Sequence, residues 1–243
     1  MRIGLISDIH ANLEALEAVL KALSRESLDL TICLGDLVGY GPDPNICVEK
    51  TIESVDLVVA GNHDYAAAGL VSTAPFNEHA RAAMEWTKTV LNNNNVELLK
   101  KLPLMQCEGN ITAVHASPES PDQWRYVIGE DDAYRNLMGL TTNLCFVGHT
   151  HMPLGYMMDT ENNLYFQQDL TAAVIESNRK YLINVGSVGQ PRDGDTRACL
   201  GILDTEKGLF ELKRIEYNVQ TTQEKMVKKE LPEFLIERLS WGR

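Results

Sequence analysis

The sequence of 243 residues lacks any segment typical of a membrane anchor or a secretion signal. Its N-terminal apolar run, Ile3–Ile6, is far shorter than the ~20 apolar residues that span a bilayer, and no longer run follows. The five cysteines are scattered and include no CxxC pair, which argues against a disulfide framework or a cysteine zinc site. We therefore expect a cytoplasmic protein with no membrane partner.

Positive charge is also scarce. The chain has 22 Lys and Arg against 34 Asp and Glu, which gives a formal net charge of −12. A field of that sign repels polyanions, and the sequence has no basic stripe of the kind that nucleic-acid binders carry, so nucleic acid is a disfavoured partner. Small phosphorylated substrates remain compatible with this charge, because a bound metal cluster can outweigh it locally.

The chain shows no internal repeat, no low-complexity segment and no Pro/Gly-rich linker, so we expect one domain over residues 1–243. Short apolar runs at Arg2–Ser7, Leu30–Leu34 and Leu57–Ala60 predict strands. Helical spacing over Asn12–Leu23 and around Ile46–Ile52 separates them. This βαβαβ opening predicts an α/β fold with a parallel-centred sheet covered by helices.

The rest of the chain divides into a helical middle and a strand-rich second half. Pro75–Leu102 is predicted to be helical, with a helix–helix turn at the asparagine run Asn92–Asn95. Asn162-Asn163 predicts a hairpin turn between Gly155–Met158 and Leu164–Phe166. The other predicted strands are Ile111–Val114, Leu144–Val147, Tyr181–Val185, Leu200–Leu203 and Phe210–Ile215, and helices over Gln220–Lys229 and Glu233–Leu239 close the chain.

Five of the six histidines lie in short motifs, each at or just after the end of a predicted strand. In open α/β sheets, ligand sites gather at such carboxyl ends, so loops from several strands can converge on one place. The motifs are Ser7-Asp8-Ile9-His10, Gly35-Asp36, Gly61-Asn62-His63-Asp64, Val114-His115 and Gly148-His149-Thr150-His151.

These residue types suit a pair of phosphate-handling metal ions. Carboxylates and a carboxamide supply oxygen ligands, imidazoles supply nitrogen, and the absence of cysteine from the motifs disfavours structural zinc. In Asp8-x-His10 and His149-x-His151, alternate residues of an extended backbone can reach a common centre. Each motif alone is weak, because a lone histidine is usually structural. All five motifs in order, each after a strand, argue for one metal site.

The five blocks resemble those of the calcineurin-like metallophosphoesterase superfamily, which run D-x-H, GD, GNH-D/E, H and GH-x-H. Two further stretches resemble a compact prokaryotic subgroup of predicted phosphodiesterases: Phe76-Asn77 with Ala80, Ala83, Trp86 and Thr87, and the run Asn184–Gly194. The resemblance implies a four-layer αββα sandwich, in which two mixed β-sheets face each other and helices cover the outside.

The resemblance also implies a role for each ligand. Two metal ions are implied, of the kind Mn, Fe, Zn or Ni, and the sequence does not choose among them. The implied ligands of the first metal are Asp8, His10, Asp36 and His151, and those of the second are Asp36, Asn62, His115 and His149. Asp36 then bridges both metals together with a water or hydroxide, which attacks phosphorus.

Two residues beside the ligands have implied catalytic roles. His63 matches the family's proton donor to the leaving oxygen, and Asp64 is expected to accept its other N–H and fix its tautomer. A structural role is the alternative for His63. Asn12 could bind substrate phosphate or only cap the following helix, and Arg192 could grip phosphate or belong to a surface turn.

The sequence therefore predicts a dinuclear-metal-dependent phosphoester hydrolase, either a phosphodiesterase or a phosphatase, that acts on a small phosphorylated substrate. A phosphoprotein phosphatase or a dinucleoside-polyphosphate hydrolase is the alternative enzyme, and a scaffold without activity is the alternative outside catalysis. Loops near Leu70–Phe76, Ser117–Arg125 and Gln190–Arg197 are expected to select the leaving group. The helical extension over 220–243 is amphipathic and either packs on its own domain or forms a homodimer contact.

Overall fold

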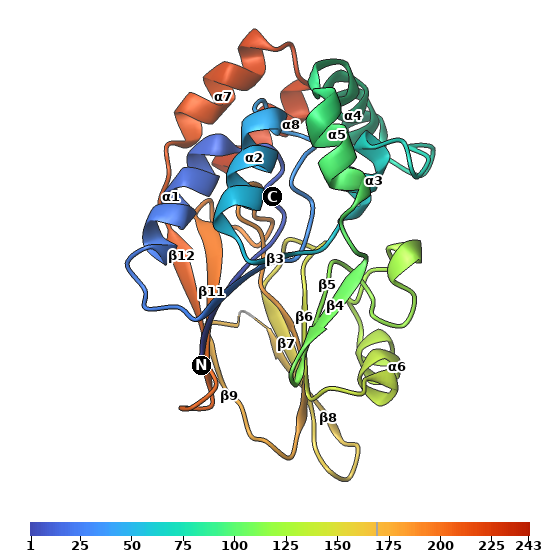
Figure 1. The fold of residues 1–243 in the computed structure, drawn as a ribbon, viewed down its shortest axis with the longest axis vertical. Coiled ribbons are helices and arrows are strands. Elements are labelled where there is room, and N and C mark those ends of the chain that lie inside the picture. Colours follow the sequence, from blue (N-terminus) through green and yellow to red (C-terminus); the bar gives the residue numbers. More distant parts are fainter. Residues whose placement is uncertain (169) are drawn as a thin grey trace.

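The computed structural model describes residues 1–168 and 170–243, which form two six-stranded mixed sheets flanked by helices (Figure 1). The first sheet has the order β3-β2-β1-β11-β12-β9, and β1, β2 and β3 run parallel. Its remaining neighbours are antiparallel. Its strands are β1 (Arg2–Ile6), β2 (Leu30–Cys33), β3 (Leu57–Val58), β9 (Ala172–Val174), β11 (Ala198–Asp204) and β12 (Leu209–Ile215).

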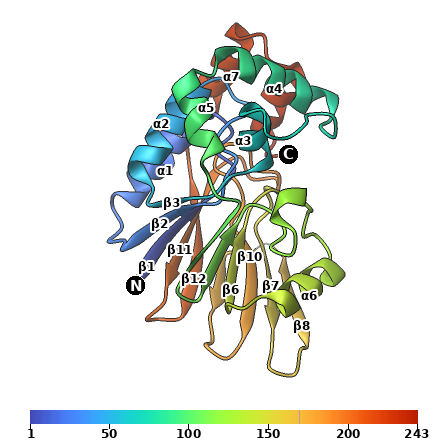
Figure 2. The same cartoon turned by 45° about the vertical axis from the view of Figure 1, so that its right-hand side comes forward.

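The second sheet has the order β4-β5-β6-β10-β7-β8, with a parallel centre of β5, β6 and β10 and antiparallel edges. Figure 2 shows its strands beside those of the first sheet. Its strands are β4 (Met105–Glu108), β5 (Ile111–Val114), β6 (Leu144–Val147), β7 (Leu154–Met158), β8 (Leu164–Gln168) and β10 (Lys180–Asn184).

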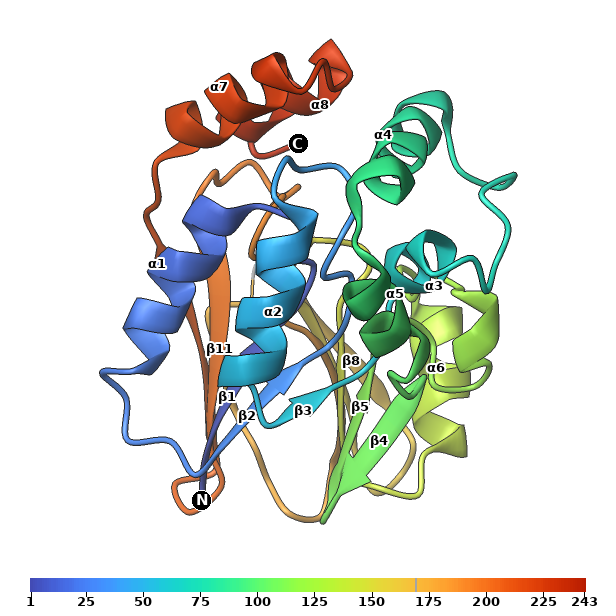
Figure 3. The same cartoon turned by 45° about the horizontal axis from the view of Figure 1, so that its top comes forward.

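The helices cover the outer faces and the end of the sheets at which the parallel strands terminate (Figures 1 and 3). Those of the first half are α1 (Leu13–Leu23), α2 (Pro44–Ser54), α3 (Asn62–Ala67), α4 (Glu78–Val90) and α5 (Asn93–Lys100). Those of the second half are α6 (Glu130–Gly139), α7 (Val219–Lys228) and α8 (Glu233–Glu237), with 3₁₀ turns at Pro121–Gln123 and Arg238–Ser240.

The core between the sheets is built from alternate residues of both. Ile3 and Leu5 of β1 meet Phe146 of β6 and Ile183 of β10 in one buried cluster. A second cluster joins the other face of the first sheet to α1 and α2, and a third joins the second sheet to α6. The four layers expected from the resemblance are therefore present, and the α/β fold class is confirmed.

Several local predictions are also confirmed. Asn92 caps α5 by accepting a hydrogen bond from the backbone N–H of Asn95, so the predicted break between two helices lies at Leu91 and Asn92, whereas Asn93–Asn95 form the first turn of α5. The hairpin of β7 and β8 turns through Asn162, whose φ of +66° suits asparagine. Four elements were not predicted: α3, β4, α6 and β9.

The C-terminal helices pack on their own chain. Met226, Leu231, Leu235 and Leu239 share a buried cluster with Tyr40, and Ala80 and Ala83 of α4 belong to the same cluster. Figure 3 shows α7 and α8 next to α4 above the strand ends. In the part of the chain that the structure describes, no helix has the length and apolar character that crossing a membrane requires.

Candidate metal centre

The ligand blocks of the sequence converge at one end of the two sheets. Asp8 and His10 follow β1, Asp36 follows β2, and Asn62 follows β3 as the first residue of α3. From the second sheet, His115 follows β5, and His149 and His151 follow β6. All seven side chains are buried. This is the arrangement expected where the carboxyl ends of parallel strands meet.

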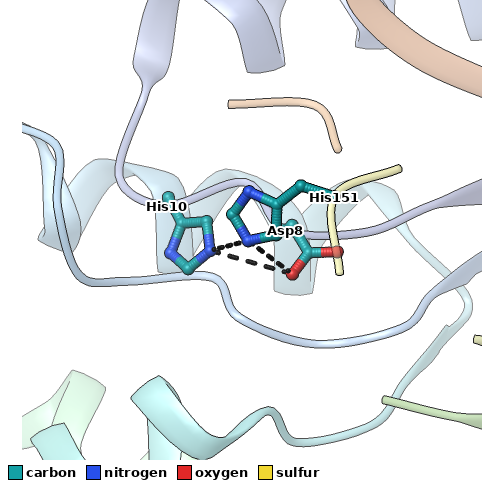
Figure 4. Close-up of side chains that lie close together, drawn as sticks. All are labelled: Asp8, His10 and His151. Atoms are coloured by element: carbon teal, nitrogen blue, oxygen red, sulfur yellow. Dashed lines mark hydrogen bonds and ion pairs between the residues drawn. The ribbon is translucent and has the colours of Figure 1, made fainter. Parts of the chain in front are cut away.

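The first cluster comprises Asp8, His10 and His151, drawn in Figure 4. The Nε2 atoms of His10 and His151 lie 3.0 Å apart. Oδ1 of Asp8 lies 3.3 Å from Nε2 of His151 and 3.7 Å from Nε2 of His10. One oxygen and two nitrogens thus face a common point, as ligands of a small cation do.

The second cluster comprises Asp36, His115 and His149. Nε2 of His115 lies 3.1 Å from Nδ1 of His149 and 3.3 Å from Oδ2 of Asp36. The same Asp36 oxygen lies 3.5 Å from Nε2 of His10, so Asp36 contacts both clusters. This is the position that the sequence-based interpretation gave to the bridging ligand.

Backbone carbonyls fix the tautomers of three of these imidazoles. Nδ1 of His10 donates to Val38 O at 3.1 Å, Nδ1 of His115 to Leu34 O at 2.7 Å, and Nδ1 of His151 to Gln190 O at 2.6 Å. In the neutral form of each imidazole, the lone pair is then on Nε2, which faces the centre. Imidazoles that ligate metals are commonly oriented by such a second hydrogen bond.

The donor set fits a pair of metal ions. With both Nδ1 atoms donating to carbonyls, the facing Nε2 lone pairs of His10 and His151 repel each other unless a cation lies between them. Oδ1 of Asn62 is buried and has no hydrogen-bond partner among residues 1–168 and 170–243. An orphaned buried acceptor is costly, and a metal ion at the second cluster would satisfy it.

Electrostatics keep most of the ligands in their metal-binding protonation states. Burial lowers the pKa of His10 well below its ordinary value and that of His149 to about 3, so both imidazoles are neutral. Burial by itself raises the pKa of Asp8, but His151 and His115 act in the opposite sense and bring it below its usual range. Metal ligands must be deprotonated, so these shifts favour metal binding.

His115 differs from the other imidazoles. Burial lowers its pKa, but the charge and hydrogen bond of Asp36 raise it to about 9. The two carboxylates thus attract positive charge to the centre, and a metal cation competes with this proton.

His63 lies beside both clusters but belongs to neither. Its ring centroid is 4.9 Å from that of His10, 4.5 Å from Tyr40 and 4.6 Å from Phe76. Its backbone N–H donates to Oδ1 of Asp36 at 2.9 Å. Its ring is thus oriented by aromatic packing, next to the carboxylate that joins the two clusters.

The expected hydrogen bond between His63 and Asp64 is not formed. Nδ1 of His63 is buried without a partner in the described chain. Both carboxylate oxygens of Asp64 instead accept backbone N–H groups: those of Leu37 (2.8 Å) and Val38 (3.2 Å) on Oδ1, and those of Asp36 (2.8 Å) and Gly61 (2.9 Å) on Oδ2. Asp64 therefore holds the loop that carries Asp36, because its carboxylate pairs four backbone N–H groups that would otherwise lack an acceptor.

The two candidate substrate-binding residues, Asn12 and Arg192, have different surroundings. Asn12 caps α1 by accepting from Ala15 N, and its amide donates to Gly189 O at 2.8 Å, so its carboxamide is committed to protein contacts. Arg192 lies at the edge of the centre, with its guanidinium 5.7 Å from the centroid of the Tyr40 ring and bound to Oε1 of Gln190. Asp193 pairs with Arg214 rather than with Arg192, so the alternative for Arg192, a surface turn with an Arg192–Asp193 pair, is not formed.

Tyr40, Trp124 and Tyr126 are aromatic neighbours of the centre that sequence reasoning did not identify. Tyr40 contacts His10 and His63, Trp124 contacts His115, and Tyr126 stacks on His149. They lie in loops between the motifs, where no periodic pattern exists. Of the three, Tyr40 alone has a sequence feature that could have indicated its place near the centre: it comes just after Gly39, within the loop that follows Asp36.

Comparison with known proteins agrees with this geometry. The family model of the calcineurin-like phosphoesterase superfamily domain matches residues 1–208. An uncharacterized protein of Methanocaldococcus jannaschii is 42% identical over 248 residues, which cover 99% of this chain and 98% of that protein.

Solved structures with similar folds include a metallophosphoesterase from Sphaerobacter thermophilus, with a TM-score of 0.86, 40% identity and coverage of 100% of this chain and 99% of that one. A hypothetical protein from Pyrococcus horikoshii OT3 shares the fold with a TM-score of 0.81 at 18% identity, covering 100% and 98%. The family match and the 40% identical relative both span most or all of the chain that carries the two clusters. The chain therefore belongs to the calcineurin-like phosphoesterase superfamily.

Proposed function

We propose that the chain is a dinuclear-metal-dependent phosphoester hydrolase that acts on a small phosphorylated molecule. The observation that carries this proposal is the pair of adjacent Asp/His clusters that share Asp36. Asp8, His10, Asp36 and His151 would hold one metal ion, and Asp36, Asn62, His115 and His149 the other. When bound, two such ions supply an activated water and stabilise the charge that develops on the phosphoryl oxygens.

The chain's own residues then have distinct tasks. Val38, Leu34 and Gln190 orient three imidazoles through their carbonyl oxygens, and Asp64 holds the loop of Asp36. Arg192 is the proposed contact of a phosphoryl oxygen, because its guanidinium lies beside Tyr40 at the edge of the centre and a guanidinium presents several donors to phosphate.

His63 is the proposed proton donor to the leaving oxygen. It is the histidine at the centre that belongs to neither cluster, and it lines a cavity next to them. Burial lowers its pKa to about 4, so its imidazole is neutral in the free protein. The negative charge of a bound phosphoryl group acts against that effect and favours the protonated form.

The test is hydrolysis of bis-p-nitrophenyl phosphate in the presence of Mn²⁺, Ni²⁺, Fe²⁺, Co²⁺ or Zn²⁺. The release of nitrophenol measures the rate. We expect activity with at least one metal and none in Asp36→Asn. His63→Asn should keep the metal content of the parent and lose roughly 10²–10⁴-fold in rate, the range typical of general acid catalysis. His79→Asn is the matched control, because His79 lies on α4 outside the centre.

Two results would contradict the proposal. Parent-like turnover by His63→Asn would remove the acid role and leave the hydrolase. Absence of hydrolysis with all five metals, in a protein that binds two metal ions per chain, would leave a scaffold that retains the site without the reaction.

A further inference from the structure

A cavity of about 510 Å³ opens beside His63 and His149. Segment 71–77 between α3 and α4 and segment 122–126 between β5 and α6 form much of its lining. These two connections lie one above the other on the same side of the molecule in Figures 1 and 2. The volume is in the range of pockets that bind small molecules, and it adjoins the metal centre directly.

Aromatic side chains form the walls of this cavity. Tyr126 stacks on His149 with centroids 4.1 Å apart and an interplanar angle of 18°, yet it remains 51% exposed. Phe76 and Trp124 also line the cavity. Phe76 packs on His63, and Trp124 contacts His115 edge to face with ring centroids 6.1 Å apart. The rings are thus positioned by the imidazoles of the centre. The uncovered part of Tyr126 offers a flat apolar surface for a second ring.

The backbone at Trp124 supports a binding role for this wall. Its φ is +53°, in the left-handed region that bulky side chains rarely adopt. It follows the 3₁₀ turn Pro121–Gln123, and the loop is closed by the hydrogen bond from Ser117 N to Arg125 O. Strained residues of this kind cluster at ligand-binding segments, where the surrounding structure holds them in place.

Charge limits what the cavity can accept. Among the described residues that line it, none is Lys or Arg, and Asp122 is the one carboxylate. A ligand that places a second phosphate or a carboxylate here finds one carboxylate and no cation in the lining itself. The guanidinium of Arg192 lies over the Tyr40 ring, 5.7 Å from its centroid, and is assigned to the phosphoryl group at the centre. Dinucleoside polyphosphates and acidic phosphopeptides therefore fit the cavity poorly, whereas a neutral ring fits both its shape and its charge.

We propose that this cavity binds the leaving group of the substrate, and that the leaving group is a flat, uncharged aromatic ring system without a second phosphate. The inference rests on the proposed phosphoester hydrolysis at the neighbouring centre, because that reaction would need the phosphoryl group at the two clusters and the leaving oxygen near His63. A nucleoside or a substituted phenol has this chemistry. Tyr126 is the stacking residue, and Asp122 excludes further anions.

Binding of phosphonates to the Mn²⁺-loaded protein tests the proposal without any turnover. Phenylphosphonate and methylphosphonate offer the same anion to the metals and differ only in the ring. By isothermal titration calorimetry we expect the phenyl compound to bind about tenfold more tightly, as one aromatic stacking contact plus burial of the ring provides. Tyr126→Ala should reduce this ratio to about twofold, Tyr126→Phe should keep it, and Tyr134→Ala on α6, an exposed tyrosine outside the cavity, should leave it unchanged.

A second arm tests the charge of the cavity. 4-Carboxyphenylphosphonate should bind the parent protein more weakly than phenylphosphonate, and Asp122→Asn should narrow that gap because it removes the facing carboxylate. Equal affinities for phenyl- and methylphosphonate, or no binding of either, would overturn the proposal. Hydrolysis of bis-p-nitrophenyl phosphate without a phenyl preference would refute the cavity assignment and keep the proposed function. A phenyl preference without hydrolysis would refute the proposed function and leave the cavity as a binding site for the ring of a phosphorylated ligand that is not cleaved.

Discussion

Replacing Asp64 by asparagine should destabilise the protein strongly, although the two side chains have nearly the same shape. Asp64 is fully buried, and its two oxygens accept four backbone N–H groups. Burial raises the pKa of this carboxyl. The four N–H donors act against that rise, because a protonated carboxyl would turn its O–H group toward donors and find no acceptor. An asparagine keeps one oxygen and turns an NH₂ group toward the other pair of donors.

The magnitude follows from the two donors that lose their acceptor. A buried donor left unpaired costs roughly 1–3 kcal/mol, so Asp64→Asn should lower the free energy of unfolding by about 2–6 kcal/mol. For a chain of this length, each kcal/mol shifts Tm by about 2–4 °C, which gives an expected drop of roughly 10 °C. Because two of the donors belong to Asp36 and Gly61, the change should also weaken metal binding.

Urea unfolding followed by circular dichroism, with chelator and with Mn²⁺, measures both effects. Asp56→Asn is the matched control: the Asp56 carboxylate also accepts a backbone N–H and a hydroxyl, from Thr31, but it is exposed, so water replaces what is lost. The control should stay within about 1 kcal/mol of the parent. If Asp64→Asn did the same, the assignment of Asp64 as the acceptor that holds the Asp36 loop would be refuted.

Two further predictions concern the centre, and a third concerns the ion pairs of Glu26. A methyl group at Gly39 would overlap Nδ1 of His63 and one at Gly148 would overlap Asp8, so Gly39→Ala should lose activity but keep both metals, whereas Gly148→Ala should lose metal by elemental analysis. Chelation should lower Tm by roughly 5–10 °C, since metal at about 100 times its Kd adds about 2.7 kcal/mol to the stability, and an unchanged Tm would mean that no structural metal was present. The hydrogen bond from Lys213 and the nearby Arg2 lower the pKa of Glu26, so its contribution is present above the unfolded pKa and is lost as the pH falls through the folded one. Glu26→Gln should therefore cost at most about 1 kcal/mol at pH 7 and progressively less as the pH falls below the ordinary range of a glutamate, and a loss that did not shrink in acid would point to a packing effect instead.

The parts of the fold that the sequence predicts are those with a continuous apolar run or a periodic apolar face. β1 was predicted from its apolar run, which is buried on both faces, and α1 because Leu16 and Val19 follow the helical period. The two missed strands carry neither pattern. β4 (Met105–Glu108) has no buried residue and β9 (Ala172–Val174) spans three residues, so both are strands because of their neighbours in the sheets rather than their own sequence.

In the candidate site, too, some residues could be predicted from the sequence and others could not. Residue type and order predicted a metal site, because metal coordination requires particular atoms, and the family resemblance then implied the seven candidate ligands. The task of Asp64 was predicted wrongly, since a carboxylate beside a histidine in sequence need not contact it in space. The aromatic wall of Tyr126 and Trp124 was not predicted, because its residues come from a loop whose path depends on the packing of the centre.

The backbone conformation of the candidate ligands explains why the centre depends on the hydrogen bonds around it. Five of the seven ligands have positive φ: Asp8 (54°), His10 (49°), Asp36 (55°), His149 (68°) and His151 (62°). Each left-handed residue other than glycine costs of order 1 kcal/mol, so the centre stores roughly 5 kcal/mol of strain. The hydrogen bonds of Val38 O, Gln190 O and the Asp64 carboxylate hold these turns in place. The proposed metal ions would therefore bind at a site that the fold has already shaped, and substitutions that release those bonds should weaken metal affinity without changing a candidate ligand.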